Sequence, residues 1–169
     1  LGDVYKRQYH YGTESSVACR KGSLLAEQLV FGCEYAGGGC GPKTKSFMVM
    51  ATNGAWSKPH GWWNMISAAK QRGVNIIVID ARRTKVAELA TIHLQPKQGT
   101  DAALGAGICR VLFEEGLYNK PFCDKWVYGV EEYRNYCKDF TPEKTEAITG
   151  VPADLIVKAC LLYTSPSPR

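Results

Sequence analysis

The sequence predicts an α/β fold: a mostly parallel, doubly wound, Rossmann-like sheet flanked by helices, with a helical C-terminal part. Two short apolar runs, residues 47–51, which are unbroken, and 74–79, which contain Asn75 as their one polar residue, are typical of strands that are buried on both faces. Between them, residues 60–72 place apolar side chains at helical spacing, and Gly73 follows as a stop. A strand, a helix and a second strand in this order indicate neighbouring parallel strands.

The remaining elements are predicted from the same periodicities. Helical patterns lie at residues 15–31, 84–90, 101–115 and, as several short helices, 119–159. Thr84 is expected to cap the second of these helices. We expect a short third strand at residues 93–95, and loops at residues 34–42 and 53–61, where Gly, Ser and Pro gather.

Both ends of the chain differ in pattern from the residues beside them. Residues 1–8 and 160–169 continue no neighbouring element, and the second stretch ends in a Ser/Pro repeat that cannot extend a helix. We expect both to be non-native ends. Residues 9–159 are then expected to be an internal fragment of one domain of a longer protein.

Composition argues against several classes of protein. The net charge of +5 falls to +3 when Lys6, Arg7, Arg169 and Asp3 are left out, and the basic residues form no stripe with aromatic residues, so nucleic-acid binding is not expected. No apolar run approaches the roughly 20 residues of a membrane-spanning helix. The seven cysteines are odd in number and form no CxxC pair, which argues against a zinc finger or a disulfide framework and fits a reducing or anoxic setting.

Polar residues follow both predicted strands. Asp80 ends the second strand, where a carboxylate can accept hydrogen bonds from two ribose hydroxyls; alternatively it caps a turn or pairs with Arg82 or Arg83. Asn53 follows the first strand in a loop with Ser57, which could surround a pyrophosphate, although an ordinary loop is the simpler interpretation and no GxGxxG fingerprint is present. These strand ends are the place where α/β sheets hold nucleotide-like cofactors.

A third polar cluster opens the later helix, at Gly99, Thr100 and Asp101. One carboxylate can accept both the N1–H and the exocyclic amine of guanine, so Asp101 is a candidate base contact; the alternative is a plain helix cap. Cys19 lies in the first helical pattern, where a thiolate would suit a soft metal; the alternative is a buried, inert cysteine. The glycines of residues 37–41 lack a GKS/T ending and a preceding strand, so a P-loop NTPase is rejected.

Five segments carry a resemblance to a known family: Asn53 with Ser57 and Pro59, then residues 79–84, 99–104, 115–118 and 148–152. In this order and spacing, residues 9–159 resemble the molybdopterin-guanine-dinucleotide oxidoreductases, the dimethyl-sulfoxide-reductase superfamily. The run at residues 82–88 looks similar to the acetylene-hydratase and formate-dehydrogenase branches.

The resemblance implies a fragment of the catalytic subunit of a molybdenum or tungsten enzyme with bis-molybdopterin guanine dinucleotide, active in two-electron or oxygen-atom transfer. It implies that the loop of Asn53 contacts the cofactor's pyrophosphate, Asp80 its ribose and Asp101 its guanine. The cofactor-binding candidates are, in chain order, Asn53, Ser57, Asp80, Arg82, Gly99, Thr100 and Asp101.

The resemblance also implies groups beyond this fragment, which is not expected to be active alone. Cys19 would be the catalytic ligand to the metal, and an iron–sulfur cluster would lie elsewhere in the parent protein. Arg20 stands where formate dehydrogenases place a histidine, so formate chemistry is not expected. The implied partners are a small-molecule substrate, the rest of the polypeptide and an electron-transfer subunit, in a cytoplasmic or periplasmic enzyme of prokaryotic type. Two rivals stay open: a Rossmann-type enzyme that uses NAD or a similar nucleotide, and a non-catalytic domain that kept the fold.

Overall fold

The computed structural model describes residues 25–29, 32 and 40–164. The chain divides into two compact units, Leu1–Gly39 and Cys40–Arg169, and each is described by itself. In the first unit, residues 25–29 are helical. The rest of the helix expected at residues 15–31 lies outside the described residues, and so does Cys19.

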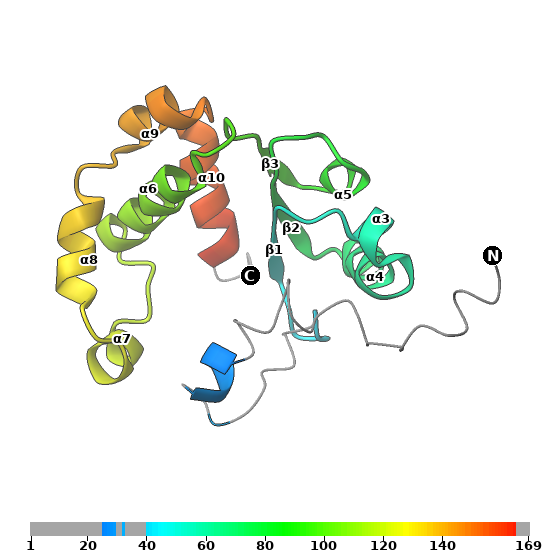
Figure 1. The fold of residues 1–169 in the computed structure, drawn as a ribbon, viewed down its shortest axis with the longest axis horizontal. Helices are drawn as coiled ribbons and strands as arrows, with labels where there is room; N and C mark the ends of the chain where they lie inside the picture. Colours follow the sequence, from blue (N-terminus) through cyan, green and yellow to red (C-terminus); the bar gives the residue numbers. More distant parts are fainter. Residues whose placement is uncertain (1–24, 30–31, 33–39, 165–169) are drawn as a thin grey trace, which may run out of the picture. The chain divides into compact units, whose positions relative to one another are not determined.

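The second unit is built on a parallel sheet of three strands (Figure 1). The strands are β1 (Ser46–Met50), β2 (Asn75–Ile79) and β3 (Ile92–Leu94), in the order β1-β2-β3. Ile79 at the end of β2 lies opposite Met50 on one side and Leu94 on the other. The α/β class and the parallel sheet are therefore confirmed, with strand bounds within one residue of those expected.

The connection from β1 to β2 corrects the sequence prediction. It holds three helical segments, α3 (Gly54–Ser57), the π-helix η1 (Pro59–Trp63) and α4 (Asn64–Gln71). The helix expected at residues 60–72 is confirmed by α4 and most of η1, whereas α3 and the start of η1 lie where we expected a loop at residues 53–61. Gly54 is buried, and a Cβ at this position would lie 2.8 Å from the Cβ of Trp62. The glycine that suggested a loop instead lets two short helices touch, because it has no side chain to keep them apart.

Between β2 and β3 lies α5 (Lys85–Glu88), and here the prediction holds. Thr84 occupies the N-cap position, and its hydroxyl accepts a hydrogen bond of 3.2 Å from the backbone N–H of Ala87. This bond satisfies one of the free N–H groups at the start of the helix.

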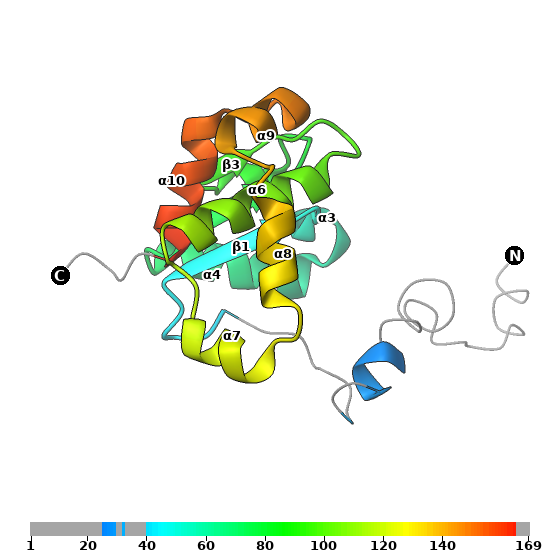
Figure 2. The same cartoon turned by 90° about the vertical axis from the view of Figure 1, so that its left-hand side faces the viewer.

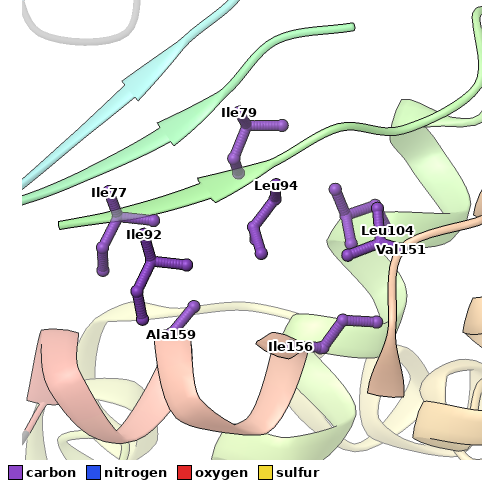
Figure 3. Close-up of a cluster of buried hydrophobic side chains, with 8 residues drawn as sticks. All are labelled: Ile77, Ile79, Ile92, Leu94, Leu104, Val151, Ile156 and Ala159. Atoms are coloured by element: carbon purple, nitrogen blue, oxygen red, sulfur yellow. The ribbon is translucent and has the colours of Figure 1, made fainter. Parts of the chain in front are cut away.

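Alternate residues of the sheet contribute to two separate cores, as the period of a strand requires. Ile76 and Val78 pack with Ile66 of α4 and Val86 of α5. The opposite core is shown in Figure 3 and consists of Ile77, Ile79, Ile92, Leu94, Leu104, Val151, Ile156 and Ala159. Because both faces of the sheet are covered, β1 and β2 are apolar after their first residues, whereas the short β3 carries His93 between Ile92 and Leu94.

The second core is closed by two C-terminal helices, α6 (Asp101–Glu114) and α10 (Ala153–Thr164) (Figure 2). The other C-terminal helices are α7 (Lys120–Trp126), α8 (Val130–Cys137) and α9 (Pro142–Thr149), of which α8 and α9 pack against α6. Helix α10 contacts all three strands. Among the described helices none alone has the length and apolar character to cross a membrane; α9 and α10 meet that test only as a pair, bent by 115°.

The boundary expected at residue 160 falls inside α10. Cys160 is buried, and the carbonyl of Leu162 accepts a hydrogen bond of 2.9 Å from the Ser46 hydroxyl of β1. The helix reaches Thr164, just before the Ser/Pro repeat. Residues 160–164 are therefore part of the packed unit, while the non-native origin of the two ends stays a prediction.

Candidate functional site

A pocket lies at the carboxyl edge of the sheet, where the loops after the strands meet. Its volume is about 210 Å³, and it is lined by Ala51, Ile79, Asp80, Ala81, Pro96, Lys97, Gln98, Gly99 and Asp101. These residues come from the segments that follow all three strands and from the first residue of α6. Three of the predicted site residues, Asp80, Gly99 and Asp101, therefore line one pocket.

Asp80 is fixed by its neighbours in the sheet. Its backbone N–H donates to the carbonyl of Leu94 at 3.1 Å, and its own carbonyl lies 2.9 Å from Nε2 of His93. One carboxylate oxygen, Oδ1, accepts a hydrogen bond of 2.8 Å from the backbone N–H of Arg82. Asp80 thus supports the turn and lines the pocket at once, and its contact with Arg82 is to the backbone rather than to the guanidinium.

Asp101 is not the helix cap that was its alternative interpretation. Thr100 occupies the N-cap position of α6, and Asp101 is the first helical residue. The Thr100 hydroxyl donates to the carbonyl of Lys97 at 2.6 Å instead of capping the helix. The Asp101 side chain is exposed and has no hydrogen-bond or ion-pair partner in the part of the chain that the structure describes. Its carboxylate is therefore free to accept donors from a ligand, next to the partial positive charge of a helix N-terminus.

Asn53 follows β1 at the same edge but does not line the pocket. Its carbonyl accepts hydrogen bonds from the backbone of Trp56 and from the hydroxyl of Ser57 at 3.1 Å, so the Ser57 hydroxyl has a local partner. Its side-chain oxygen Oδ1 is buried and has no partner among the described residues. A buried acceptor without a donor is costly, which suits a position that receives a ligand's donor.

Arg82 and Thr100 also lie outside the set of pocket-lining residues. The Arg82 residue is exposed, two positions after Asp80, and Thr100 is half-buried between two residues that line the pocket. Gly99 has a positive φ of 79°, a conformation that favours glycine and lets the backbone turn into α6.

Lys97 is the pocket residue that the sequence interpretation missed. Its backbone N–H donates to the carbonyl of Thr149 at 2.8 Å, so the loop after α9 holds it in place. Lys97 makes no ion pair with a described residue, although two carboxylates line the same pocket. A lysine two residues before a Gly-Thr-Asp cluster was the available signal, but a lysine in a polar loop is too common to be chosen on that ground alone.

No metal centre is visible in the described part of the chain, where no three His, Cys, Asp or Glu side chains are grouped to hold an ion. The proposed metal ligand Cys19 lies outside the described residues. The polar side chains among the pocket-lining residues are two carboxylates, one ammonium and the amide of Gln98, a mixture that matches an organic ligand with both donors and acceptors better than an ion.

Comparison with known proteins finds relatives named as a hydratase and as formate dehydrogenases, although no family model matches the chain. It is 42% identical over 112 residues to acetylene hydratase of Syntrophotalea acetylenica, a match that covers 64% of this chain and 15% of that protein. It is 40% identical over 100 residues to formate dehydrogenase H of Escherichia coli, covering 59% of this chain and 14% of the relative. The F420-dependent formate dehydrogenase subunit alpha of Methanocaldococcus jannaschii is 38% identical over 98 residues, covering 58% of this chain and 15% of the relative.

The fold is similar to a solved structure as well. Acetylene hydratase from Pelobacter acetylenicus matches with a TM-score of 0.66 and 38% sequence identity, over 74% of this chain and 17% of the other. The chain thus spans less than a fifth of the length of these relatives. It is similar in sequence to one segment of acetylene hydratase and of the formate dehydrogenases, and in fold to one segment of acetylene hydratase.

Proposed function

We propose that the chain is a segment of the catalytic subunit of an enzyme that carries molybdopterin guanine dinucleotide with molybdenum or tungsten, and that the pocket at the sheet edge binds the guanosine end of one pterin. The observation that carries the proposal is the meeting of Asp80 and Asp101 in one pocket. They lie in different elements, and neither carboxylate is neutralised by an ion pair with a described residue.

The pocket offers the acceptors that guanosine needs. Guanine presents two donors side by side, and the free carboxylate of Asp101 can accept both. The second carboxylate oxygen of Asp80, unlike Oδ1, has no hydrogen-bond partner among the described residues and can accept from a ribose hydroxyl. The buried Oδ1 of Asn53 can accept a hydrogen bond from a donor group of the cofactor. Ser57, Arg82, Gly99 and Thr100 flank these groups and complete the proposed contact set.

The metal would be held by Cys19, and when bound it supplies two-electron or oxygen-atom transfer. One of the relatives is named for a hydration rather than a redox reaction, so the parent enzyme falls in an oxidoreductase or hydratase family. The parent is proposed to contain an iron–sulfur cluster, to bind a small-molecule substrate and to pair with an electron-transfer subunit. The role proposed for the described residues is to bind and orient the guanosine end of the cofactor.

The proposal is tested by titrating the purified chain with guanosine, guanosine monophosphate, adenosine monophosphate and NAD, with backbone amide shifts as the readout. We expect guanosine and its monophosphate to shift the amides of residues 97–101. Asp101→Ala should weaken this binding by about 1–3 kcal/mol, because guanine's two donors lose their acceptor. Asp139→Ala, an exposed carboxylate between α8 and α9, is the matched control and should bind normally.

The results separate the proposal from its rivals. Preferential binding of NAD would support a Rossmann-type nucleotide enzyme instead. Guanosine binding that survives Asp101→Ala would remove the assigned base contact. In the intact parent, release of a guanine nucleotide together with molybdenum or tungsten on denaturation would support the cofactor assignment directly.

A further inference from the structure

Residues 148–152 belong to a motif that the guanosine pocket does not use. None of them lines the pocket, yet they form the sharp connection between α9 and α10 beside it. Thr149 ends α9 and is fully buried. A buried hydroxyl at a helix end needs a physical reason, because burial of a hydroxyl is costly unless it is hydrogen-bonded.

The Thr149 hydroxyl makes two hydrogen bonds within this connection. It donates to the carbonyl of Thr145 at 2.7 Å and accepts from the backbone N–H of Val151 at 3.1 Å. Gly150 between them has a φ of 76°, and its N–H donates to Glu146 at 2.7 Å. Val151 is buried beside Leu104 of α6 in the second core (Figure 3). The two hydrogen bonds of the Thr149 hydroxyl therefore fix the backbone at the connection between α9 and α10.

This connection is hydrogen-bonded to a residue that lines the pocket. The carbonyl of Thr149 accepts a hydrogen bond of 2.8 Å from the backbone N–H of Lys97. The carbonyl of Lys97 in turn accepts from both the N–H and the hydroxyl of Thr100, at 3.2 and 2.6 Å. Thr100 then leads into Asp101, the first residue of α6. A continuous set of hydrogen bonds thus runs from the Thr149 hydroxyl to the turn that carries Asp101.

We infer that Thr149 is a positioning residue: through Lys97 it fixes the turn of residues 97–101 and thereby sets the affinity of the pocket for its ligand. This inference rests on the proposed guanosine site for its ligand, but its first step, the fixing of the turn, does not. The Lys97 stem supports the same arrangement, because its Cε lies 3.2 Å from the position that a Cβ on Gly150 would occupy. Glycine at this position gives the lysine chain room to lie across the connection.

The test replaces the hydroxyl alone. Thr149→Val keeps the shape of the side chain but leaves the Val151 N–H without its acceptor, whereas Thr149→Ser keeps both bonds. Thr164→Val is the matched control: its hydroxyl also donates to the carbonyl four residues earlier, Cys160, at 2.7 Å, but at the far end of α10. Each folded variant is measured for guanosine affinity and for hydrogen exchange of the Lys97 amide.

We expect Thr149→Val to bind guanosine about tenfold more weakly and to exchange the Lys97 amide faster, since tenfold in an equilibrium constant corresponds to the loss of about one hydrogen bond. Thr149→Ser and Thr164→Val should match the original chain in both measurements. Normal affinity in Thr149→Val, or equal losses in Thr164→Val, would overturn the inference.

The failure of the proposed function gives a different result. If the original chain binds no guanosine, the proposed function is refuted and the inference is judged on the turn alone. Faster exchange of the Lys97 amide in Thr149→Val then supports the positioning role, and unchanged exchange overturns it.

Discussion

Substitution of Gly107 by alanine should destabilise the second unit, although alanine is the better helix former. Gly107 is buried in α6, where α6 packs against α9. A Cβ added here would lie 2.7 Å from Cγ2 of Thr145, 3.0 Å from its Cβ, and closer still to its Oγ1. Thr145 is fully buried, and its Cβ is attached to the backbone, so the helices themselves must move apart.

The two opposing effects can be compared in size. Alanine gains about 1 kcal/mol over glycine inside a helix. Overpacking a filled core costs typically about 1–3 kcal/mol, and a clash with an immobile β-branched residue belongs at or above the upper end. The net prediction for Gly107→Ala is a loss of about 2 kcal/mol in the free energy of unfolding. Urea unfolding followed by far-ultraviolet circular dichroism measures this loss.

Gly105 provides the control within the same helix. A Cβ at Gly105 would meet no atom within 4 Å, so Gly105→Ala should stabilise the chain by up to about 1 kcal/mol. The stability losses caused by Gly107→Ala and by Thr145→Ala should not add in the double variant, because removal of the threonine's outer atoms makes room for the new methyl group. The reasoning is refuted if Gly107→Ala is as stable as the original chain, or if the two glycine variants change stability alike.

Two further predictions concern single side chains in the second unit. Thr84→Ala should lower the free energy of unfolding by about 1 kcal/mol, since the backbone N–H of Ala87 loses its acceptor and α5 its cap. Thr84→Ser keeps the hydroxyl and should therefore keep the stability. Equal losses in both variants would contradict the capping role. Burial, helped by Cys109 nearby, raises the pKa of Cys160 from 9.0 to about 12. Between pH 9 and pH 12 the Cys160 thiol is deprotonated in the unfolded chain but still protonated in the folded chain. As pH rises above 9, this difference should therefore lower the free energy of unfolding by about 1.4 kcal/mol per pH unit. Urea unfolding at pH 8 to 11 should show a shallower decline in Cys160→Ala, and an unchanged slope would count against the assignment.

Much of the fold could be predicted because its signals are local. The strands β1 and β2 appear as largely apolar runs since both faces of the sheet are covered, and Thr84 marks a helix start through a hydrogen bond to the residue three positions later. The loop expected at residues 53–61 was wrong: it was predicted from the gathering of Gly, Ser and Pro, but one of these residues, Gly54, has another role. Its actual use is the close approach of two short helices, which depends on a contact with Trp62.

The site was predictable only in part. Asp80 and Asp101 were candidates because each follows a recognisable boundary, and the structure brings them to one pocket. Lys97 was missed because nothing within a few residues of it distinguishes it from an ordinary surface lysine. What distinguishes it is a hydrogen bond to Thr149, 52 positions along the chain.

By itself the sequence determined the α/β class and the strand and cap positions, which depend on residues within one or two turns of each other. It also determined the family resemblance, which depends on the order of five short segments along the chain. The tertiary structure alone decided that Asp80 and Asp101 share a pocket, that Thr149 holds Lys97, and that Gly107 has no room for a methyl group. The physical reason is that periodicity and capping act along the chain, whereas pocket geometry and close packing are set by how helices and strands meet across it.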